Sequence, residues 1–566
     1  MEVKNIFFSA LKKQKENNLN EASNLYKKVL KLKPNHLNTI FNLATIYAQT
    51  NKYSDALKLF LKYTNLNSKN YSAYNDLGLT YFQLGRIEEA IKNVKKSIDL
   101  NPKYAEAYNN VGLMLSRNGQ IEEAEKYCLK SYNLNPKSFA TYTNLKQIYK
   151  IKGDFKNLEK LYLNTIKLNP KFFDTYEELM DFYERSHEEK KLEIIIKQVE
   201  KIFKKNNVVN LYKGKVLFKN QKFHEVISLL ESSSYAKKSS EQTKFLILAK
   251  SYDKINKNEK AYENFSKMNQ LSFQNKRSKI NKDRYLNIVK ERVNFFVEDK
   301  YKEWKLFKDD EKINNPVFLI GFPRSGTTLL DTILRSHPKI EIIEEKPIIN
   351  EIKNELENLT NGNFLNLNKI SLNDIKRIRE SYFKNRLEFT GKESKDKIYI
   401  DKNPLNIIFV GEIIRVFPNA KFLFTLRNPY DCVLSCFMQD FLLNDAMANF
   451  ININDAAILY NEIMKLWHQY LTIFQIQNYT VKYEGLVSNF EENVRKVLDF
   501  LNLEWSDSIN KYQETAIKRV LISTPSYNQV TQPIYKQAVN RWKKYENKLE
   551  NIKPIIDPWV KKFNYK

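Results

Sequence analysis

Cysteine is scarce in this chain, and its few residues exclude two common architectures. Cys128, Cys432 and Cys436 are too few for a disulfide framework, which is typical of proteins from reducing compartments. Cys432 and Cys436 stand four residues apart on an expected helix, but no second ligand pair accompanies them. We therefore expect no structural disulfides and no zinc or other metal site.

Long apolar runs are also missing. No stretch approaches the roughly 18 consecutive apolar residues that a membrane-spanning helix needs. The apolar residues Ile6 to Phe8 are followed by Lys12 and Lys13, too soon for the core of a signal peptide. The sequence thus predicts a soluble cytoplasmic protein without a membrane span.

Positive charge dominates the composition, with 93 Lys and Arg against 66 Asp and Glu and a formal net charge of +27. Such a surface could attract nucleic acid, an anionic nucleotide or an acidic substrate. Lysines are abundant throughout, however, and no compact basic block stands out, so the charge also fits solvated helix faces. Nucleic-acid binding is therefore not expected. At 566 residues the chain should hold at least two domains.

The N-terminal half repeats itself with a period of 34 residues. The recurring residues are Pro34, Pro102, Pro136 and Pro170, then Gly85, Gly119 and Gly153, and Ala22, Ala56, Ala90 and Ala124. The best-preserved unit, Tyr71 to Tyr104, resembles the tetratricopeptide repeat, a helix–turn–helix. Five clear units span about Val3 to Phe172, and up to three degenerate ones follow to about Gln274.

These patterns predict three regions in the chain. They are an all-α tetratricopeptide-repeat superhelix over residues 1–274, a connecting helical segment over 275–314, and an α/β domain over 315–566. Such arrays commonly bind peptides or partner proteins on a concave face. Capping of the next domain and self-association are the alternatives, and the sequence assigns neither a ligand of the array nor an oligomeric state.

The stretch from Pro316 to Pro347 combines a short apolar run with turn residues. Val317–Ile320 is typical of a buried strand, Gly321–Thr328 of a loop, and Leu329–Arg335 of a helix. Loops of this kind bind anions, because free backbone N–H groups and the positive end of the helix dipole converge there. The glycine spacing matches a nucleotide-binding loop, but Thr327 replaces the lysine that reaches the outer phosphates of ATP or GTP. The loop therefore predicts a shorter anion, such as a 5′-phosphate with one extra group.

Strand-like and helix-like runs alternate from Pro316 onward, which predicts an α/β sheet with mostly parallel strands. The expected strands are Val317–Ile320, Lys339–Ile343, Lys397–Ile400, Lys421–Leu426 and Tyr479–Lys482. Polar residues that follow them are Arg324, Glu344, Glu345, Lys402, Arg427, Tyr483 and Glu484. Because ligands of such sheets lie at the carboxyl ends of the strands, these side chains should share one edge.

Several short motifs in this order closely resemble the sulfotransferase superfamily. They are Pro-Arg-Ser-Gly-Thr-Thr at 323–328, His-Pro at 337–338, Glu-Glu at 344–345, Leu-Arg-Asn-Pro at 426–429 with Ser435, Tyr-Glu-Gly-Leu at 483–486, Asp-Phe-Leu at 499–501, Thr-Pro-Ser at 524–526 and Asn-Arg-Trp at 540–542. Within the superfamily the chain is similar to bacterial proteins that fuse tetratricopeptide repeats to a sulfotransferase domain, and beyond them to tyrosylprotein sulfotransferases. The resemblance covers about Pro316 to Lys566.

The resemblance implies a P-loop-like domain that uses the sulfuryl donor 3′-phosphoadenosine 5′-phosphosulfate (PAPS) as co-substrate. The residues implied to hold the 5′-phosphosulfate are Arg324, Ser325, Gly326, Thr327 and Thr328. Those implied to hold the 3′-phosphate are Arg427 and Ser435. Tyr483 would contact the adenine, and Ser526 and Arg541 would close over the nucleotide.

The resemblance also implies a catalytic set. Glu345, 21 residues after Arg324, corresponds to the catalytic glutamate of tyrosylprotein sulfotransferases and would take the proton of the acceptor hydroxyl. Arg324 and Lys402 would neutralise the charge that develops on the departing phosphate and the sulfuryl group. The simpler alternatives are an ordinary loop carboxylate for Glu345 and a helix cap for Lys402. We expect structural roles for His337 and His468.

The function that follows is sulfuryl transfer to a hydroxyl acceptor. A protein or peptide acceptor, including tyrosine, would suit the repeats, while carbohydrate, lipid-linked and small phenolic acceptors stay open. The alternative from another class is a repeat scaffold whose C-terminal domain binds nucleotide without turnover. An ATP-dependent kinase is disfavoured by Thr327 in the lysine position.

Overall fold

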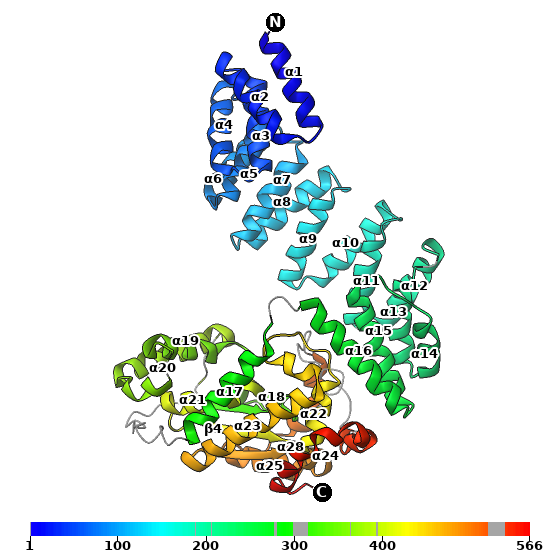
Figure 1. Ribbon diagram of the computed structural model, residues 1–566, viewed down its shortest axis with the longest axis vertical. Helices are drawn as coiled ribbons and strands as arrows, with labels where there is room; N and C mark the ends of the chain where they lie inside the picture. The colour runs from blue at the N-terminus through cyan, green and yellow to red at the C-terminus, as the bar shows by residue number, and fades with distance from the viewer. Residues whose placement is uncertain are drawn as a thin grey trace. The chain divides into compact units, whose positions relative to one another are not determined.

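The computed structural model describes residues 2–186, 188–204, 206–276, 280–297, 315–362, 364–391, 394, 396–518 and 538–565. Its contacts divide the chain into a first unit, residues 1–212, and a second unit, residues 213–566 (Figure 1). The three regions predicted from the sequence, with bounds at 274 and 314, remain a prediction. None of the described helices is both long enough and apolar enough to cross a membrane.

The first unit consists of helices joined by short turns. They are α1 (Glu2–Lys15), α2 (Leu19–Leu32), α3 (Leu37–Gln49), α4 (Tyr53–Leu66), α5 (Tyr71–Gln83), α6 (Ile87–Leu100), α7 (Ala105–Arg117), α8 (Ile121–Leu134), α9 (Phe139–Lys152), α10 (Phe155–Leu168), α11 (Phe173–Arg185) and α12 (Glu189–Ile202). The recurring alanines and glycines explain why the helices pair closely. A methyl group on Gly112 of α7 would lie 2.3 Å from Sγ of Cys128 on α8, so only glycine fits.

Buried asparagines connect successive repeats of the first unit. The side-chain amide of Asn110 donates to Oδ1 of Asn75 at 2.8 Å, and that of Asn144 donates to Oδ1 of Asn109 at 2.9 Å. Asn75, Asn109 and Asn110 are all buried. Since buried amides are stable only when hydrogen-bonded, these pairs help to fix the stacking of the first helices.

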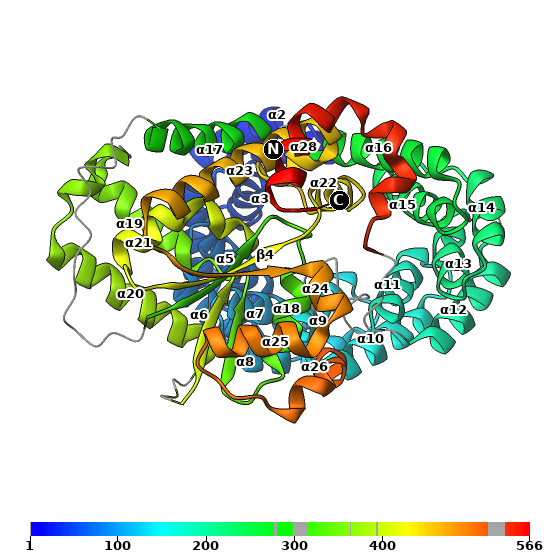
Figure 2. The ribbon, with the colours of Figure 1, turned by 90° about the horizontal axis from the view of Figure 1, so that it is seen from below.

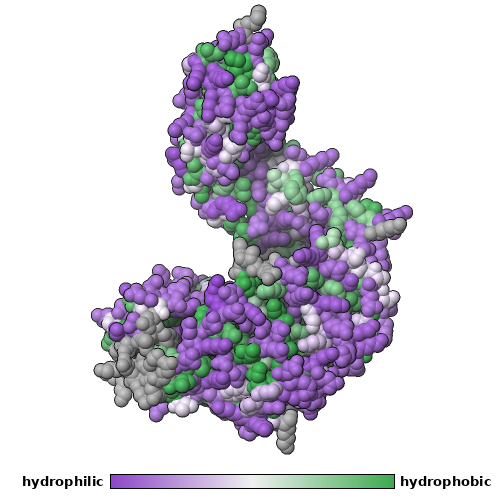
Figure 3. Space-filling model, viewed as in Figure 1, coloured by the Kyte–Doolittle hydropathy of each residue, from purple (hydrophilic) through white to green (hydrophobic). Residues whose placement is uncertain are grey.

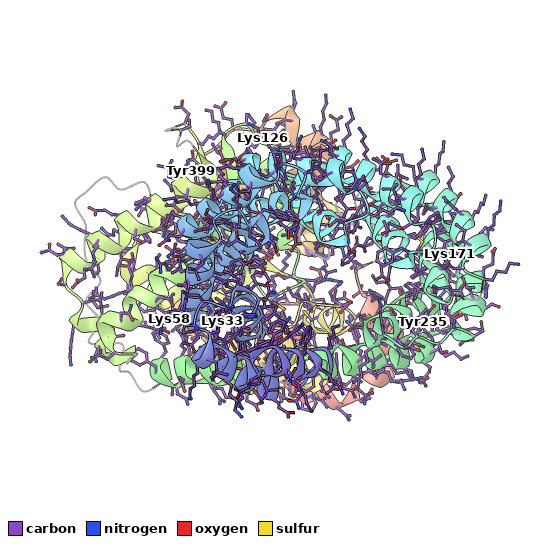
Figure 4. The ribbon with its side chains drawn as sticks, turned by 90° about the horizontal axis from the view of Figure 1, so that it is seen from above. Lys33, Lys58, Lys126, Lys171, Tyr235 and Tyr399 are labelled. Carbon is purple, nitrogen blue, oxygen red and sulfur yellow. The ribbon has the colours of Figure 1, made fainter. Side chains whose placement is uncertain are left out.

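The surface lysines come from many separate elements. Lys33, Lys58, Lys126 and Lys171 are exposed, and Figure 4 shows them extending from different parts of the helical array. Figure 3 shows hydrophilic residues over most of the visible face, with hydrophobic patches between them. The distribution of these lysines fits the dispersed charge that the sequence suggested.

The second unit begins with helices and continues into a sheet. The helices before the sheet are α13 (Val208–Lys219), which spans the boundary, α14 (Phe223–Glu231), α15 (Lys238–Lys254), α16 (Asn258–Lys276) and α17 (Lys282–Val297). Asn269 of α16 donates to the carbonyl of Phe437 at 2.8 Å, and Tyr262 stacks on the Phe437 ring. Arg292 of α17 pairs with Glu412 at 2.5 Å, which gives this glutamate a structural partner.

Five strands form one sheet in the order β2-β3-β1-β4-β5. They are β1 (Val317–Gly321), β2 (Ile340–Glu344), β3 (Ile398–Lys402), β4 (Lys421–Leu426) and β5 (Gln477–Lys482). All neighbouring pairs are parallel, which confirms the predicted α/β class. Glu344 and Lys402 are the last residues of their strands, because the β2–β3 ladder extends to that pair.

Helices cover both faces of the sheet (Figure 2). They are α18 (Thr327–Arg335), α19 (Ile348–Thr360), α20 (Leu372–Thr390), α21 (Val410–Val416), α22 (Pro429–Phe437), α23 (Ile453–Ile473), α24 (Tyr483–Ser488), α25 (Phe490–Phe500), α26 (Tyr512–Lys518) and α28 (Lys553–Lys562). On one face Leu319, Ile400 and Leu423 pack against α18 and α25. On the other, Phe424 of β4 packs against Trp467 of α23. Nearly every residue of β1, β3 and β4 is buried, as expected for inner strands of a parallel sheet, whereas the edge strand β5 is only partly buried.

Candidate active site

The carboxyl ends of the strands bring the predicted residues to one edge of the sheet. Leu319 pairs with Lys402, Glu344 with Lys402, and Leu426 with Lys482 in the parallel ladders. The loops that follow these residues therefore start side by side. In open α/β sheets, ligands bind at this carboxyl edge.

The loop after β1 is held tightly by its neighbours. Oγ of Ser325 and Oγ1 of Thr425 lie 2.7 Å apart in the interior. A methyl group on Gly321 would lie 2.5 Å from that Thr425 oxygen, so the loop leaves β1 only with glycine there. Gly326 is the N-cap of α18 at φ 108°, where a side chain would be strained and 3.0 Å from the Tyr483 ring. The backbone N–H groups of Thr327 and Thr328 open the helix, as an anion site needs.

Arg324 connects the loop with α22 and with the residues just before that helix. Its Nε donates to Oγ of Ser435 at 3.1 Å, and its carbonyl accepts from Nη1 of Arg427 at 3.2 Å. The structure thus brings together Arg324, Ser435 and Arg427, three of the residues predicted to bind the donor. They come from two segments of the chain that lie more than 100 residues apart.

Arg427 keeps one donor group unused. It is 7% exposed, its guanidinium lies 5.0 Å from the centre of the Tyr483 ring, and its Nη2 donates to the carbonyl of Ala538 at 2.6 Å. Its Nε has no partner among the described residues. A buried N–H without a partner is costly, so this group is suited to an incoming phosphate oxygen.

Lys402 and Glu345 form an ion pair at the same edge. Nζ of Lys402 lies 2.6 Å from Oε1 of Glu345 and 3.3 Å from Oε1 of Glu344. The Lys402 side chain is fully buried, whereas that of Glu345 is 40% exposed. The lysine is therefore fixed inside the protein, while the Glu345 carboxylate reaches solvent.

Arg324 and Glu345 share an unusual backbone conformation. Among the described non-glycine residues with positive φ, all others except Gln221 are Asn, which tolerates this conformation better; Arg324 has φ 70° and Glu345 φ 50°. The N–H of Glu345 donates to the carbonyl of Lys402 at 2.8 Å, which holds the strained residue in place. Strain of this kind is concentrated at functional sites.

Asp331 is a member of this charged cluster that the sequence analysis missed. It is fully buried on α18, and its Oδ1 pairs with Nε of Arg335 at 2.9 Å. Burial raises the pKa of Asp331, and the positive charges of Arg335 and Lys402 oppose that rise. The spacing of Asp331 and Arg335, four residues apart on one helix face, was the available signal.

The other residues predicted to bind the sulfuryl donor lie in different surroundings. Tyr483 begins α24 at the end of β5 and lies against both Gly326 and Arg427. Arg541 forms an ion pair with Asp253 of α15 at 3.0 Å between Nη2 and Oδ2. Ser526 lies outside the described residues.

The contacts of His337, His468, Cys432 and Cys436 are those of side chains that support the fold. Nδ1 of His337 accepts the N–H of Lys339, so Nε2 is the donor toward the carbonyl of Glu504 at 3.1 Å, and neither nitrogen is free as a base. His468 stacks on Trp559 and Phe563. The thiols of Cys432 and Cys436 both donate to the carbonyl of Pro323, and burial raises the pKa of Cys432 to about 12. These thiols thus support the loop that carries Arg324.

Models of known families match two parts of the chain, within residues 15–138 and over residues 316–507. Residues 316–507 match the model of the sulfotransferase family. Residues 78–119 and 105–138 match models described as TPR repeat and tetratricopeptide repeat, and residues 15–97 match subunit 3 of the anaphase-promoting complex, cyclosome.

Known proteins with similar sequences cover parts of the chain. A protein of Aquifex aeolicus described as uncharacterized is 28% identical over 360 residues, 60% of this chain and 46% of its own length. Protein-tyrosine sulfotransferase 2 of Gallus gallus is 25% identical over 236 residues, 40% of this chain and 62% of its own length. The crystal structure of MamA aligns with 28% of this chain and 92% of its own length, at 27% identity and a TM-score of 0.27.

The chain spans about half the length of these curated relatives. Its C-terminal match begins at residue 316, one residue before β1, and contains Arg324, Glu345, Lys402, Arg427 and Ser435. The protein therefore combines tetratricopeptide repeats with a domain of the sulfotransferase family.

Proposed function

We propose that this protein transfers a sulfuryl group from PAPS to a hydroxyl group of an acceptor. The proposal rests on one observation: two sets of side chains meet at the carboxyl edge of the sheet. One set is the ion pair of Glu345 and Lys402 at 2.6 Å, and the other is the cluster of Arg324, Ser435 and Arg427. The family match over residues 316–507 supports the reaction class.

The donor would lie along the loop after β1 and the start of α22. The backbone N–H groups of residues 326–328 and the Arg324 side chain would hold the 5′-phosphosulfate. Arg427 and Ser435 would hold the 3′-phosphate, since a guanidinium and a hydroxyl both donate to phosphate oxygens. The unpaired Nε of Arg427 supports this fit. Tyr483 would contact the adenine, and Ser526 and Arg541 would complete the enclosure.

The transfer would proceed by in-line displacement. The acceptor oxygen forms a bond to sulfur while the bond between sulfur and the bridging phosphate oxygen breaks, and the electron pair of that bond remains on the phosphate. Glu345 takes the proton of the acceptor hydroxyl. Arg324 and Lys402 donate hydrogen bonds to the departing phosphate and the sulfuryl oxygens, which stabilises the charge of a loose transition state.

The buried position of Lys402 suits this role. Its ammonium is fixed by Glu344 and Glu345 before a substrate binds, so little reorganisation is needed when charge develops. Glu345 is more exposed and can exchange its contact with Lys402 for the acceptor hydroxyl. The strained backbone at Glu345 then serves to direct the carboxylate toward the acceptor.

We further propose a polypeptide acceptor with a tyrosine hydroxyl. Two observations favour it over carbohydrate and small phenols: the relative from Gallus gallus is named a protein-tyrosine sulfotransferase, and this chain carries tetratricopeptide repeats, which commonly bind peptides.

The decisive experiment is a transfer assay with PAPS labelled in the sulfuryl group and a panel of tyrosine peptides, glycans and phenols. We expect label on peptides, and at least about a 100-fold lower kcat in Glu345→Ala, because a general base typically supplies that much. Glu344→Gln is the matched control, since this neighbour also contacts Lys402 but is 11% exposed, and its effect should be much smaller.

Three results would overturn parts of the proposal. Equal activity of Glu345→Ala and wild type would remove that residue from the mechanism. Label on glycans or phenols alone would replace the polypeptide acceptor. Tight binding of adenosine 3′,5′-bisphosphate without transfer to any acceptor class would favour the nucleotide-binding scaffold.

A further inference from the structure

Asp431 is a buried carboxylate that the proposed function leaves without a role. It lies in the first turn of α22, four residues after Arg427, and is 1% exposed. Its Oδ2 accepts the N–H of Asn540 at 2.7 Å, and its Oδ1 accepts the N–H of Trp542 at 2.8 Å. One carboxylate therefore holds the backbone on both sides of Arg541.

Residues 538–548, which we call the closing segment, have further attachments to the same turn. Nη2 of Arg427 donates to the carbonyl of Ala538 at 2.6 Å. The ring of Trp542 stacks on Tyr430 with centroids 4.7 Å apart and an interplanar angle of 21°. Arg427, which is proposed to hold the 3′-phosphate, thus lies in the same short stretch as Tyr430 and Asp431, which fasten the closing segment.

The opposite side of the closing segment is attached to α15 and α16. Oδ2 of Asp253 pairs with Arg541 at 3.0 Å, and its Oδ1 accepts from the hydroxyl of Tyr545 at 2.6 Å. Lys548 pairs with Glu259 of α16 at 2.7 Å. These helices lie before the region matched by the sulfotransferase family model, so a part of the chain outside that match contributes to the attachment.

The contacts of Asp431 are strong by their chemistry. Hydrogen bonds to an ionised carboxylate are shorter and roughly twice as strong as those between neutral groups. Burial raises the pKa of Asp431, while the charge of Arg427 and the N–H groups of Trp542 and Asn540 lower it. Loss of the carboxylate would remove the partner that the N–H groups of Asn540 and Trp542 have on the buried Asp431 side chain.

We propose that Asp431 is a positioning residue of the donor site, which fastens the closing segment beside Arg427, a residue proposed to hold the 3′-phosphate, with Asp253 as the second anchor. The inference rests on the proposed function for the identity of the donor. Asp431 uses both of its oxygens on the backbone and touches no reacting atom. Its loss should therefore weaken donor binding and leave the chemical step nearly unchanged.

The test compares Asp431→Asn with wild type in the full-length protein. We expect the Kd of adenosine 3′,5′-bisphosphate and the KM of PAPS to rise about 10-fold or more, the loss typical of a hydrogen bond to a charged group, while kcat changes little. Peptides covering residues 538–548 should exchange their amide hydrogens faster. Asp455→Asn is the matched control, because Asp455 pairs with Lys282 of α17 and, among the described residues, has no hydrogen bond or ion pair with the closing segment.

A second variant keeps the inference testable if Asp431→Asn fails to fold. Asp253→Asn removes the ion pair to Arg541 from the opposite side and leaves the Asp431 contacts in place. It should also accelerate exchange in the closing segment and weaken bisphosphate binding, by a smaller factor. Unchanged exchange and unchanged bisphosphate affinity in both variants would overturn the inference while leaving the transferase proposal intact. A wild type that binds no bisphosphate would instead overturn the donor assignment.

Discussion

At the scale of single residues, this site is distinguished by charges that the protein buries. Lys402, Asp331 and Asp431 are nearly inaccessible to water, and each has charged or strongly polar partners. Burying a charge is expensive unless partners compensate for it. This cost in free energy is typical of a site in which charged and hydrogen-bonding side chains must be fixed before a charged substrate arrives.

Asp401, the neighbour of Lys402 in β3, lacks such compensation. Its side chain is buried, neither carboxyl oxygen has a partner among the described residues, and burial raises its pKa to about 7. In the unfolded chain the pKa of an Asp carboxyl group is about 3.9. Between these two values the unfolded chain loses its proton while the folded protein keeps it, so stability should fall as the pH rises from about 4 to about 7.

We therefore predict that Asp401→Asn flattens the pH dependence of the free energy of unfolding. The wild type should lose roughly 4 kcal/mol over that range, since one pKa unit corresponds to about 1.4 kcal/mol. Urea unfolding between pH 4 and pH 8 measures it, with the exposed Asp396→Asn as the matched control. An Asp401→Asn variant whose pH slope equals that of wild type would contradict the assignment.

At the scale of elements, close helix pairing in the first unit depends on single small residues. Gly112 lies inside α7, where alanine would by itself favour the helix by about 1 kcal/mol. The added methyl group would lie 2.3 Å from Sγ of Cys128 and 3.1 Å from the carbonyl of Ala124. Contacts that short force α7 and α8 apart, so the steric cost exceeds the gain in propensity.

We predict that Gly112→Ala destabilises the first unit by about 1–3 kcal/mol, measured by thermal or urea unfolding. Combining it with Cys128→Ala removes the shortest contact, so the two substitutions should be strongly non-additive in a double-mutant cycle. A neutral Gly112→Ala, or simple additivity with Cys128→Ala, would show that the α7–α8 pairing is looser than the distances indicate.

At the scale of the whole molecule, the two compact units should respond differently to adenosine 3′,5′-bisphosphate. This is the product that remains after PAPS has given up its sulfuryl group. Arg427, Ser435 and the loop after β1 all belong to the second unit. A ligand stabilises only the folded unit that binds it, by about 2.7 kcal/mol at 100 times its Kd. We predict that adenosine 3′,5′-bisphosphate raises the Tm of one transition only, the one that belongs to residues 213–566.

Calorimetry with and without the bisphosphate tests this prediction, and Arg427→Ala should abolish the rise in Tm. Adenosine 5′-monophosphate is the matched control ligand, because it lacks the 3′-phosphate that Arg427 would hold. It should raise the Tm less than the bisphosphate does, and by the same amount in wild type and in Arg427→Ala. A rise in both transitions, or in neither, would contradict the placement of the donor site.

Much of the fold could be predicted from the sequence because its signals are local. The 34-residue period, the alternation of strands and helices, and the turn from Gly321 to Gly326 depend on residues close together in the chain. The strand ends were less certain: β2 and β3 run to Glu344 and Lys402, since pairing between strands decides where a strand stops. Helix α19 (Ile348–Thr360) was not predicted at all.

The sequence by itself determined the repeats, the parallel sheet and the residues at its carboxyl edge, because periodicity and motif spacing carry that information. Only the tertiary structure decided which of those residues touch. The pair of Lys402 with Glu345, the bond from Arg324 to Ser435, and the anchors Asp431 and Asp253 join segments between 57 and 292 residues apart. No local pattern encodes such contacts, since they arise when packed elements bring distant side chains to the same place.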